Sequence, residues 1–406
     1  MKYKVIDGKG IIPDGTNEIA ESAFKGCTRL QSIVIPGSVT VIGSEAFSGC
    51  TSLQSIVIPD SVTRINYSAF SGCNNLTSII VSKNNSRYKS TNNCILTKDG
   101  KKLILCRSHN IPDSVTMIGD WAFKGCTSLQ SIIIPDRVTS IGWAAFWGCT
   151  SLQSIVIPDS VTVIGGSAFS CTSLQSIVIP NGETRIDTST FEGCGGLQSI
   201  VIPDSVKEIG ESAFSYCTSL QSIEIPDSVT KIKSHAFEGC TSLQSIVIPD
   251  RVTTIDRTAF IRCNNLTSII VSKNNPEYKS TNNCMLTKDG KELILCRSHN
   301  IPDGVTKIGR WAFDGCTSLQ SIVIPDSVTT IAHNAFCDCI SLQSITIATQ
   351  EKRPDMSREK IEYLLQELSE YLKEISLRVP IGCGYAYRHH TAFEGKFKNI
   401  IADIDA

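Results

Sequence analysis

Cysteine and histidine are the side chains of this chain that could do chemistry, because both bind zinc and both take part in catalysis. The sequence holds 18 cysteines and six histidines. A candidate set of zinc ligands lies towards the C-terminal end: His333, Cys337 and Cys339, with Cys383, His389 or His390 as the fourth ligand. The C-x-C spacing in this set is weak evidence for zinc. We therefore expect no metal and no other cofactor.

Catalysis needs groups brought together from fixed positions, and residues that recur in every repeat rarely provide one unique constellation. By register, His109 and His299 take the place of a core isoleucine in a strand. We expect both to be hydrogen-bonded structural histidines instead of catalytic bases. The sequence has no phosphate-binding loop and no G-x-S-x-G motif. We therefore predict that the protein is not an enzyme. An active site could lie only in the C-terminal segment, outside the repeats.

Twelve of the cysteines occupy one position of a repeated unit: Cys27, Cys50, Cys73, Cys126, Cys149, Cys171, Cys194, Cys217, Cys240, Cys263, Cys316 and Cys339. A residue used once per turn at an inward position is most simply a small buried hydrophobe. Adjacent turns would lie about 5 Å apart, which alone would permit disulfides. Stacked side chains point in the same direction, however, so we expect a column of reduced, buried thiols.

The element that positions these cysteines is a unit of 23 residues, for which Cys240–Arg262 is a clear example. Its residues Leu243, Ile246 and Ile248 form the pattern L-x-x-I-x-I, which predicts one strand, and Pro249 ends that strand because it has no N–H to donate. A fixed period of this length indicates a solenoid. One strand per turn, stacked in parallel on its neighbours, buries a core that no single turn could bury alone.

The last core residue of the strand recurs fifteen times: Ile12, Ile35, Ile58, Val81, Ile111, Ile134, Ile157, Ile179, Ile202, Ile225, Ile248, Val271, Ile301, Ile324 and Ile347. The steps are of 23 residues, except for one of 22 and two of 30. The short step lacks a residue between Phe169 and Cys171. We predict one elongated domain over residues 1–347, a right-handed leucine-rich-repeat solenoid of the α/β class with a parallel β-sheet, mostly strand and loop.

The two long steps contain nearly the same insertion, near residues 82–106 and 272–296. Two apolar runs in each flank an Asp-Gly pair, which is a strong hairpin signal: Asp99-Gly100 and Asp289-Gly290. We therefore predict two protruding hairpins, and the close similarity of the copies indicates duplication of roughly half the solenoid. Charges are reversed at four equivalent places, so we expect these side chains to be solvated: Arg87/Glu277, Lys102/Glu292, Asp120/Arg310 and Lys124/Asp314.

Residues 348–406 no longer follow the repeat. Ser357 can cap a helix whose apolar residues form an i, i+3, i+4, i+7 stripe up to Ile375, and Pro380 ends it. We expect a helix-containing cap or appendage that covers the open end of the solenoid. An oligomerisation or partner helix is the alternative. The final stretch contains A-F-E-G, as at residues 236–239, and could be a decayed repeat.

The charge and hydropathy of the chain exclude several classes of partner. The formal net charge is −1 and no long run of one sign occurs, so nucleic acid and anionic membranes are poor candidates. No apolar run approaches the roughly 20 residues that a spanning helix needs, so we expect no membrane insertion. The N-terminal stretch MKYKVIDGKGIIPDG lacks the apolar segment of a secretory signal, which fits a cytoplasmic location.

Sequence variation between the repeats is concentrated around an Ala-Phe dipeptide, and all four tryptophans lie there. Tyr67, Trp121, Trp143 and Trp147 fall on nearly successive turns, so they could form one aromatic patch on the flank or convex side of the solenoid. The alternative is an outer packing layer in which each ring lies over its neighbouring turn. Aromatic anchors dominate protein–protein hot spots. The predicted partner-binding residues are Tyr67, Trp121, Trp143, Trp147 and Trp311, with Tyr88 and Tyr278 of the hairpins.

The unit C-x-S-L-x-S-I-x-I-P-x-x-V-x-x-I-x-x-x-A-F-x-G resembles the BspA-like leucine-rich repeats, also called the Treponema pallidum type, over about residues 1–347. The insertions are similar to that family's N-x-x-Y plus D-G insert, and the matching residues are Asn85/Tyr88 with Asp99-Gly100 and Asn275/Tyr278 with Asp289-Gly290. Members are typically surface-exposed proteins of bacteria and some mucosal protists, implicated in adhesion to host proteins and to other cells. The family has no catalytic residues to carry over.

This resemblance implies a non-enzymatic, adhesin-like protein-recognition scaffold that is secreted or at the cell surface. The implied ligand is a protein, from a host or from a cell surface. A competing hypothesis is an intracellular effector or sensor, in which the repeats recognise a partner and the C-terminal segment assembles or signals. The oligomeric state does not follow from these residues.

Overall fold

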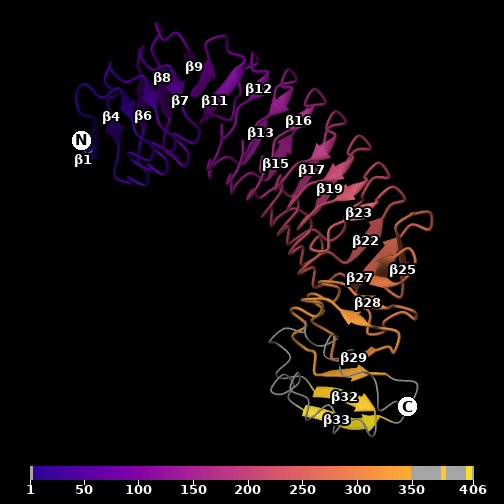
Figure 1. The fold of residues 1–406 in the computed structure, drawn as a ribbon. Coiled ribbons are helices and arrows are strands. Elements are labelled where there is room, and N and C mark those ends of the chain that lie inside the picture. The colour runs from indigo at the N-terminus through magenta and orange to yellow at the C-terminus, as the bar shows by residue number, and fades with distance from the viewer. Residues whose placement is uncertain (1–2, 349–375, 381–398, 405–406) are drawn as a thin grey trace. The chain divides into compact units, whose positions relative to one another are not determined.

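The computed structural model describes residues 3–348, 376–380 and 399–404. These residues form β-strands joined by tight turns, and none of them lies in a helix. The chain divides into two compact units, Met1–Thr218 and Ser219–Ala406. Within each unit, successive turns of the chain lie side by side (Figure 1).

In the first unit, the strand of the L-x-x-I-x-I pattern recurs as β4 (Ser32–Ile33), β6 (Ser55–Ile58), β8 (Ser78–Val81), β13 (Ser131–Ile133), β15 (Ser154–Val156), β17 (Ser176–Val178) and β19 (Ser199–Val201). A second, shorter strand ends at the isoleucine of V-x-x-I in β3 (Glu18–Ile19), β5 (Val41–Ile42), β7 (Arg64–Ile65), β12 (Met117–Ile118), β14 (Ser140–Ile141), β16 (Val163–Ile164), β18 (Arg185–Ile186) and β20 (Glu208–Ile209). The unit begins with an antiparallel pair, β1 (Lys4–Ile6) and β2 (Lys9–Ile11).

The second unit repeats this arrangement. Its longer strands are β22 (Ser245–Ile248), β24 (Ser268–Val271), β29 (Ser321–Ile324) and β31 (Ser344–Ile347). Its shorter strands are β21 (Lys231–Ile232), β23 (Thr254–Ile255), β28 (Lys307–Ile308) and β30 (Thr330–Ile331).

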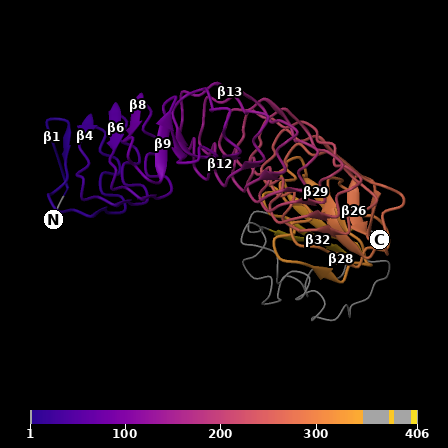
Figure 2. The same ribbon diagram turned by 90° about the horizontal axis from the view of Figure 1, so that it is seen from above.

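Equivalent strands of neighbouring turns pair in parallel, with a residue opposite its own equivalent in the next repeat. Ser131 lies opposite Ser154 in β13 and β15, and Ser245 lies opposite Ser268 in β22 and β24. Figure 2 shows the turns of the first unit side by side. The isoleucine of each strand points inwards while the serine before it is exposed or half-buried, as a period of two requires. The predicted parallel β-solenoid with one repeat per turn is therefore confirmed.

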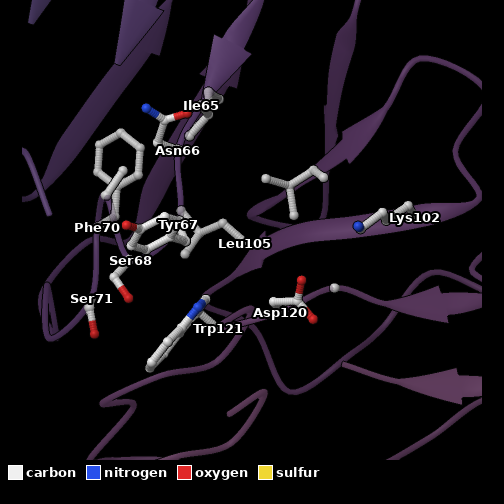
Figure 3. Close-up of a pocket in the computed structure, with 13 residues that line it drawn as sticks. Ile65, Asn66, Tyr67, Ser68, Phe70, Ser71, Lys102, Leu105, Asp120 and Trp121 are labelled. Carbon is white, nitrogen blue, oxygen red and sulfur yellow. The ribbon is translucent and has the colours of Figure 1, made fainter. Parts of the chain in front are cut away.

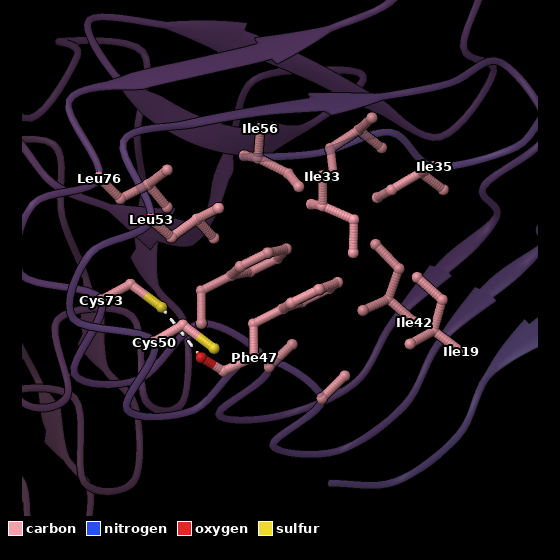
Figure 4. Packing of buried hydrophobic residues seen from close by; sticks show 14 of the residues in the cluster. Ile19, Ile33, Ile35, Ile42, Phe47, Cys50, Leu53, Ile56, Cys73 and Leu76 are labelled. Atoms are coloured by element: carbon pink, nitrogen blue, oxygen red, sulfur yellow. Dashed lines mark hydrogen bonds between the residues drawn. The ribbon is translucent and has the colours of Figure 1, made fainter. Parts of the chain in front are cut away.

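The core of each turn is a phenylalanine surrounded by isoleucine, leucine and valine (Figure 4). Phe24, Phe47 and Phe70 form a continuous stack, with ring centroids 5.4 and 5.2 Å apart and nearly parallel planes. This spacing follows from the distance of about 5 Å between paired strands. Because successive regular turns present the same ring at the same height, the phenylalanines cover one another, and the rings are almost fully buried.

The cysteine column lies beside the phenylalanine stack, and all twelve of its thiols are free. The Cys50 S–H donates to the carbonyl oxygen of Phe24 at 3.0 Å, and the Cys73 S–H donates to that of Phe47 at 3.1 Å (Figure 4). Cysteine thus fills a small apolar space and also supplies a weak donor to a buried carbonyl of the preceding turn. Burial raises the pKa of the Cys50 thiol to about 12, so it stays protonated. The predicted column of reduced thiols agrees with this structure.

The prediction that all twelve cysteines lie in the buried column is wrong for one of them, Cys171. Cys171 is exposed, and its backbone has φ 56° in the left-handed region. Its N–H donates to the Glu192 carbonyl at 2.7 Å, the bond that Gly148 makes to Ser170 in the preceding turn. Thr172 takes the core position, and its hydroxyl donates to the Phe169 carbonyl at 2.8 Å. The missing residue of the short step therefore lies after the column position and not before it.

Each insertion is a three-stranded antiparallel segment that continues into the solenoid. The strands are β9 (Tyr88–Thr91), β10 (Cys94–Thr97) and β11 (Lys102–Cys106) in the first unit, and β25 (Tyr278–Thr281), β26 (Cys284–Thr287) and β27 (Glu292–Cys296) in the second. The Asp-Gly pair joins the last two strands, as predicted. The hairpin does not simply protrude, however, because β11 pairs in parallel with β12, and β27 pairs in parallel with β28.

A disulfide crosses each hairpin, from Cys94 to Cys106 and from Cys284 to Cys296. The expectation of reduced thiols concerned the column, and the repeat pattern predicts no role for these four cysteines. A signal was present, because the two cysteines of each pair flank the Asp-Gly turn at nearly equal distances. Residues at such positions of a hairpin lie opposite each other, and Cys94 indeed pairs with Cys106 in the sheet register.

The C-terminal segment adds two more strands, β32 (Ser376–Pro380) and β33 (Asn399–Ile404), parallel to β31. Ser376 lies opposite Asn399, so the step between these strands is again 23 residues. The helix predicted from Ser357 to Ile375 lies outside the described residues. A helical cap is not supported where this segment is described, since both parts of it are strands that extend the sheet. No described helix is long and apolar enough to span a membrane.

Candidate functional site

The candidate site lies at the corner of the repeat that carries the Ala-Phe dipeptide. The residue before this dipeptide has a left-handed backbone in most turns, and its N–H or the next one bonds to the neighbouring turn. Small residues such as Ser68 and Ser167 usually occupy this position. Trp121 adopts it with φ 62° and Trp311 with φ 61°. A bulky residue here costs on the order of 1–3 kcal/mol, and such strain is concentrated at functional positions.

Four of the predicted residues form one cluster in the first unit, which we call the aromatic surface: Tyr67, Trp121, Trp143 and Trp147. The ring centroids of Tyr67 and Trp121 are 6.4 Å apart, with 28° between the planes. Trp143 and Trp147 meet Trp121 edge-on at 4.5 and 6.2 Å. Trp121 is half-buried, whereas Tyr67, Trp143 and Trp147 are 63%, 47% and 38% exposed. The rings pack on one another, as the alternative prediction held, and three of them still keep more than a third of their surface open to solvent.

Lys124 is the charged residue at the centre of the aromatic surface. Its Nζ lies 4.1 Å from the ring centroid of Trp121 and 4.5 Å from that of Trp147. It also donates to the Ser68 hydroxyl at 3.4 Å. Burial lowers the pKa of Lys124. The ammonium group therefore fixes the two indoles relative to each other through cation–π contacts.

A cavity of about 260 Å³ opens between Tyr67 and Trp121 (Figure 3). Phe70 and Leu105 provide apolar lining, and Lys102 and Asp120 stand on the opposite side from Tyr67. The cavity exists because the turn that contains the first insertion has no Ala-Phe corner. The corner of Phe70 therefore meets that of Phe123 directly, with the Gly72 N–H donating to the Lys124 carbonyl at 3.4 Å, and the flank beside them is left open.

Arg107 takes over the bonds of the missing corner. Its Nη2 donates to the Phe70 carbonyl at 2.6 Å, and its Nη1 donates to the Cys106 carbonyl at 3.1 Å and to the Cys126 sulfur at 2.7 Å. The neighbouring Cys149 thiol and the Arg107 guanidinium lower the pKa of Cys126. Because the arginine fills the inward space, the chain after it is displaced outwards. His109 and its equivalent His299 are exposed, so the prediction that they are core histidines is wrong.

The second unit has the same backbone but different side chains at the equivalent place. Arg257 stands where Tyr67 does, and its Nη2 lies 3.2 Å from Glu292 Oε1, which replaces Lys102. Lys307 Nζ lies 3.3 Å from the same oxygen. Ile294 beneath these ion pairs is 3% exposed, whereas its equivalent Ile104 is half-buried and lines the cavity. The ion pairs of the second unit thus cover Ile294, whereas the equivalent Ile104 of the first unit is left at an open cavity.

The remaining predicted residues lie apart from the aromatic surface. Trp311 belongs to the second unit and is half-buried at the place equivalent to Trp121. Tyr88 and Tyr278 are half-buried, and their hydroxyls accept hydrogen bonds from the N–H groups of Ile65 and Ile255, both at 3.1 Å. The fold therefore uses these two hydroxyls.

The asparagine of the N-x-x-Y pattern is structural as well. Asn85 is fully buried; its amide donates to the carbonyls of Pro59 and Val62, and its side-chain oxygen accepts from the N–H groups of Arg87 and Tyr88. One side chain thus holds the start of the insertion against the preceding turn.

The candidate zinc ligands do not form a cluster in the described part of the chain. Cys339 donates its S–H to the Phe313 carbonyl at 3.1 Å as a member of the column. Cys337 lies instead near two carboxylates, with its sulfur and oxygens of Asp314 and Asp338 within 4.8 Å of one another. The Asp314 carboxylate already accepts the Arg262 N–H through its Oδ1. Cys383, His389 and His390 lie outside the described residues.

Solved structures of bacterial leucine-rich-repeat proteins are similar to this chain. A leucine rich cell surface protein from Faecalibacterium prausnitzii is 27% identical over 78% of this chain and 95% of its own, with a TM-score of 0.55. A leucine-rich repeat protein from Bacteroides ovatus is 26% identical over 85% and 92%, with a TM-score of 0.45. The leucine rich repeat protein of T. pallidum is 27% identical over 54% and 87%, with a TM-score of 0.30.

No curated protein matches the chain. The family model described as a BspA type leucine rich repeat region, in six copies, matches residues 9–98, 102–220, 184–288 and 292–363. These ranges contain the repeated strand and the Ala-Phe corner, and they break only at the Asp-Gly turns of the two insertions. The chain belongs to the family of BspA-type leucine-rich-repeat proteins.

Proposed function

We propose that this chain is a non-enzymatic, adhesin-like scaffold that binds a protein of a host or of another cell through the aromatic surface. The observation that carries the proposal is the cluster of exposed rings around Trp121. Two indoles and a phenol ring exposed together are unusual on a soluble protein, because large aromatic rings are normally buried. Protein–protein hot spots are enriched in Trp and Tyr.

The rigidity of the aromatic surface supports a recognition role. Trp121 contacts Tyr67, Trp143 and Trp147, and Lys124 lies over two of the indoles. Side chains held in this way lose little conformational freedom on binding, which favours affinity. The relative from F. prausnitzii is named a cell surface protein, which supports a location at the cell surface for this chain as well.

Binding to cultured epithelial cells tests the proposal. The variant Trp143→Ala/Trp147→Ala is compared with the unchanged chain and with His333→Ala/Cys337→Ala, the double variant at the equivalent places of the second unit. We expect the tryptophan double variant to lose at least tenfold in cell binding, with an unchanged melting temperature, and protease treatment of the cells to abolish binding. Binding that survives both the double substitution and protease treatment would contradict the proposal.

A further inference from the structure

The cavity beside the aromatic surface has the dimensions of a small, specific site. At about 260 Å³ it is somewhat smaller than the roughly 300–1,000 Å³ of pockets that hold drug-sized ligands. It therefore takes a group of about one ring. Its lining combines apolar and polar side chains, which excludes a purely hydrocarbon occupant because polar groups would lose their water without compensation.

Two aromatic rings face the cavity from opposite sides. The rings of Tyr67 and Trp121 are inclined by only 28° with 6.4 Å between their centroids, and Phe70 and Leu105 add apolar lining. Carbon atoms in contact lie about 3.5–4.0 Å apart, so the exposed Tyr67 ring needs only a small rotation to admit a flat ring against Trp121. The occupant must accordingly have apolar faces.

The polar side of the cavity offers donors and acceptors that the fold does not use. Within the described residues, Lys102 Nζ and the Asn66 side-chain amide have no hydrogen-bond partner. Asp120 Oδ1 accepts the Trp143 N–H at 2.8 Å, and its second oxygen has no such partner in that same part of the chain. One cation and one anion face the cavity together, so the matching ligand is neutral and carries groups that both donate and accept.

We propose that this pocket binds one neutral pyranose ring of a glycan, with the C–H faces of the sugar on Tyr67 and Trp121 and its hydroxyls on Asn66, Lys102 and Asp120. The proposal rests on the recognition function proposed above, because it names the ligand of one part of the same surface. A proline-rich peptide also docks between aromatic rings. It is less suitable, because a proline ring has no hydroxyls for the three polar side chains.

The second unit supplies a matched control for this site. There Arg257 and Glu292 replace Tyr67 and Lys102, and they pair with each other at 3.2 Å. The double variant Tyr67→Arg/Lys102→Glu should therefore fill the first pocket with an ion pair that the same backbone already accommodates. The converse variant Arg257→Tyr/Glu292→Lys/Arg310→Asp should create a second pocket.

The test is calorimetric titration and saturation-transfer NMR of the whole chain with glucose, galactose, mannose and N-acetylglucosamine, and with a polyproline decapeptide. We expect at least one sugar to bind with a Kd of about 1 mM, as suits a ligand that buries one ring. Tyr67→Arg/Lys102→Glu should weaken it at least tenfold without changing the melting temperature, and the converse variant should raise the stoichiometry from one to two. Absence of sugar binding, binding unaffected by the double variant, or binding of the decapeptide alone would overturn the proposal.

The two proposals fail independently. Cell binding that depends on Trp143 and Trp147, without binding of any sugar, leaves the recognition function standing and refutes the sugar site. Sugar binding that Tyr67→Arg/Lys102→Glu abolishes, with cell binding unaffected by Trp143→Ala/Trp147→Ala, supports the sugar site and refutes the proposed adhesion surface.

Discussion

The regions around the two insertions have the same backbone but different side chains at the flank of the solenoid. The tyrosine that holds the insertion against the solenoid is the same in both, since Tyr88 and Tyr278 each accept a hydrogen bond of 3.1 Å. At the flank, by contrast, Tyr67 and Lys102 border a cavity, whereas Arg257 and Glu292 form an ion pair. The fold thus requires the residues that hold the insertion, such as Tyr88 and Tyr278, and tolerates different side chains at the flank. A change of binding function therefore has room at the flank without loss of stability.

Removal of the disulfides should give the largest loss of stability. It is also the most direct test of whether the two insertion regions are equally stable. Replacing Cys94 and Cys106 by serine should lower the free energy of unfolding by about 3 kcal/mol, since the bridge closes a loop of similar length to those for which that value holds. The pair Cys284 and Cys296 should show the same loss. Urea denaturation, with hydrogen exchange of β10 and β26 as local probes, measures both. A loss in only one region would show that the insertions differ in stability as well as in side chains.

The bridging arginines should give a smaller and unequal effect. Arg107 donates to the Phe70 and Cys106 carbonyls, whereas Nη2 of Arg297 has no partner within the described residues. We expect Arg107→Met to cost about 2–3 kcal/mol and Arg297→Met about 1 kcal/mol, because each lost charged donor leaves a carbonyl unsatisfied. Urea denaturation of the two variants side by side checks the difference, and equal losses would contradict it.

The stability of the second unit should depend on pH through Asp314. This residue occupies the place that Lys124 has in the first unit. Burial raises the pKa of Asp314 from 3.8 to about 6. The folded state thus holds this proton more tightly than the unfolded chain, so its stabilising contribution is complete below about pH 4 and is lost as the pH rises through 6. We expect a loss of about 2 kcal/mol between pH 4 and pH 7.

The control for this pH dependence is Asp314→Asn, which cannot ionise. Urea midpoints of the variant and of the unchanged chain should converge at pH 4 and diverge at pH 7, with the variant more stable at pH 7. Parallel curves across this range would show that Asp314 is not the titrating group.

The smallest effect should come from Lys124, at the centre of the aromatic surface. Lys124→Met removes the cation from Trp121 and Trp147 but keeps most of the aliphatic chain, so we expect a loss of about 0.5–1 kcal/mol. The tryptophan fluorescence should also shift, because the environment of both indoles changes. An unchanged spectrum would mean that the ammonium group does not lie over these rings in solution.

The repeat made most of this fold predictable from the sequence. The strand pattern, the phenylalanine and cysteine columns and the grouping of Tyr67 with the three tryptophans all follow from a constant step, because equal steps place equivalent residues side by side. Where the step changes, the predictions fail. Cys171 and Thr172 exchanged roles at the short step, and His109 lies outside the core beside the first insertion.

The reason for these failures is that an irregular turn must satisfy its buried carbonyls with whatever side chain can reach them. Arg107 does so for the Phe70 carbonyl across a turn that has no corner of its own. Nothing in the local pattern around Arg107 marks it as buried, since the contact joins residues 37 positions apart. The cavity could not be predicted from the sequence either, because it results from the absence of an Ala-Phe corner in the turn that contains the insertion.

The thiol-to-carbonyl bonds of the column have a consequence for how the chain can evolve. A regular turn has its own S–H donor for the turn before it and its own phenylalanine carbonyl for the turn after it, as Cys50 does for Phe24 and Phe47 does for Cys73. A turn gained or lost as a whole therefore leaves no unsatisfied donor or acceptor behind. Recombination between the nearly identical coding segments can then lengthen or shorten the protein in steps of one repeat, while the corners diverge freely towards new ligands.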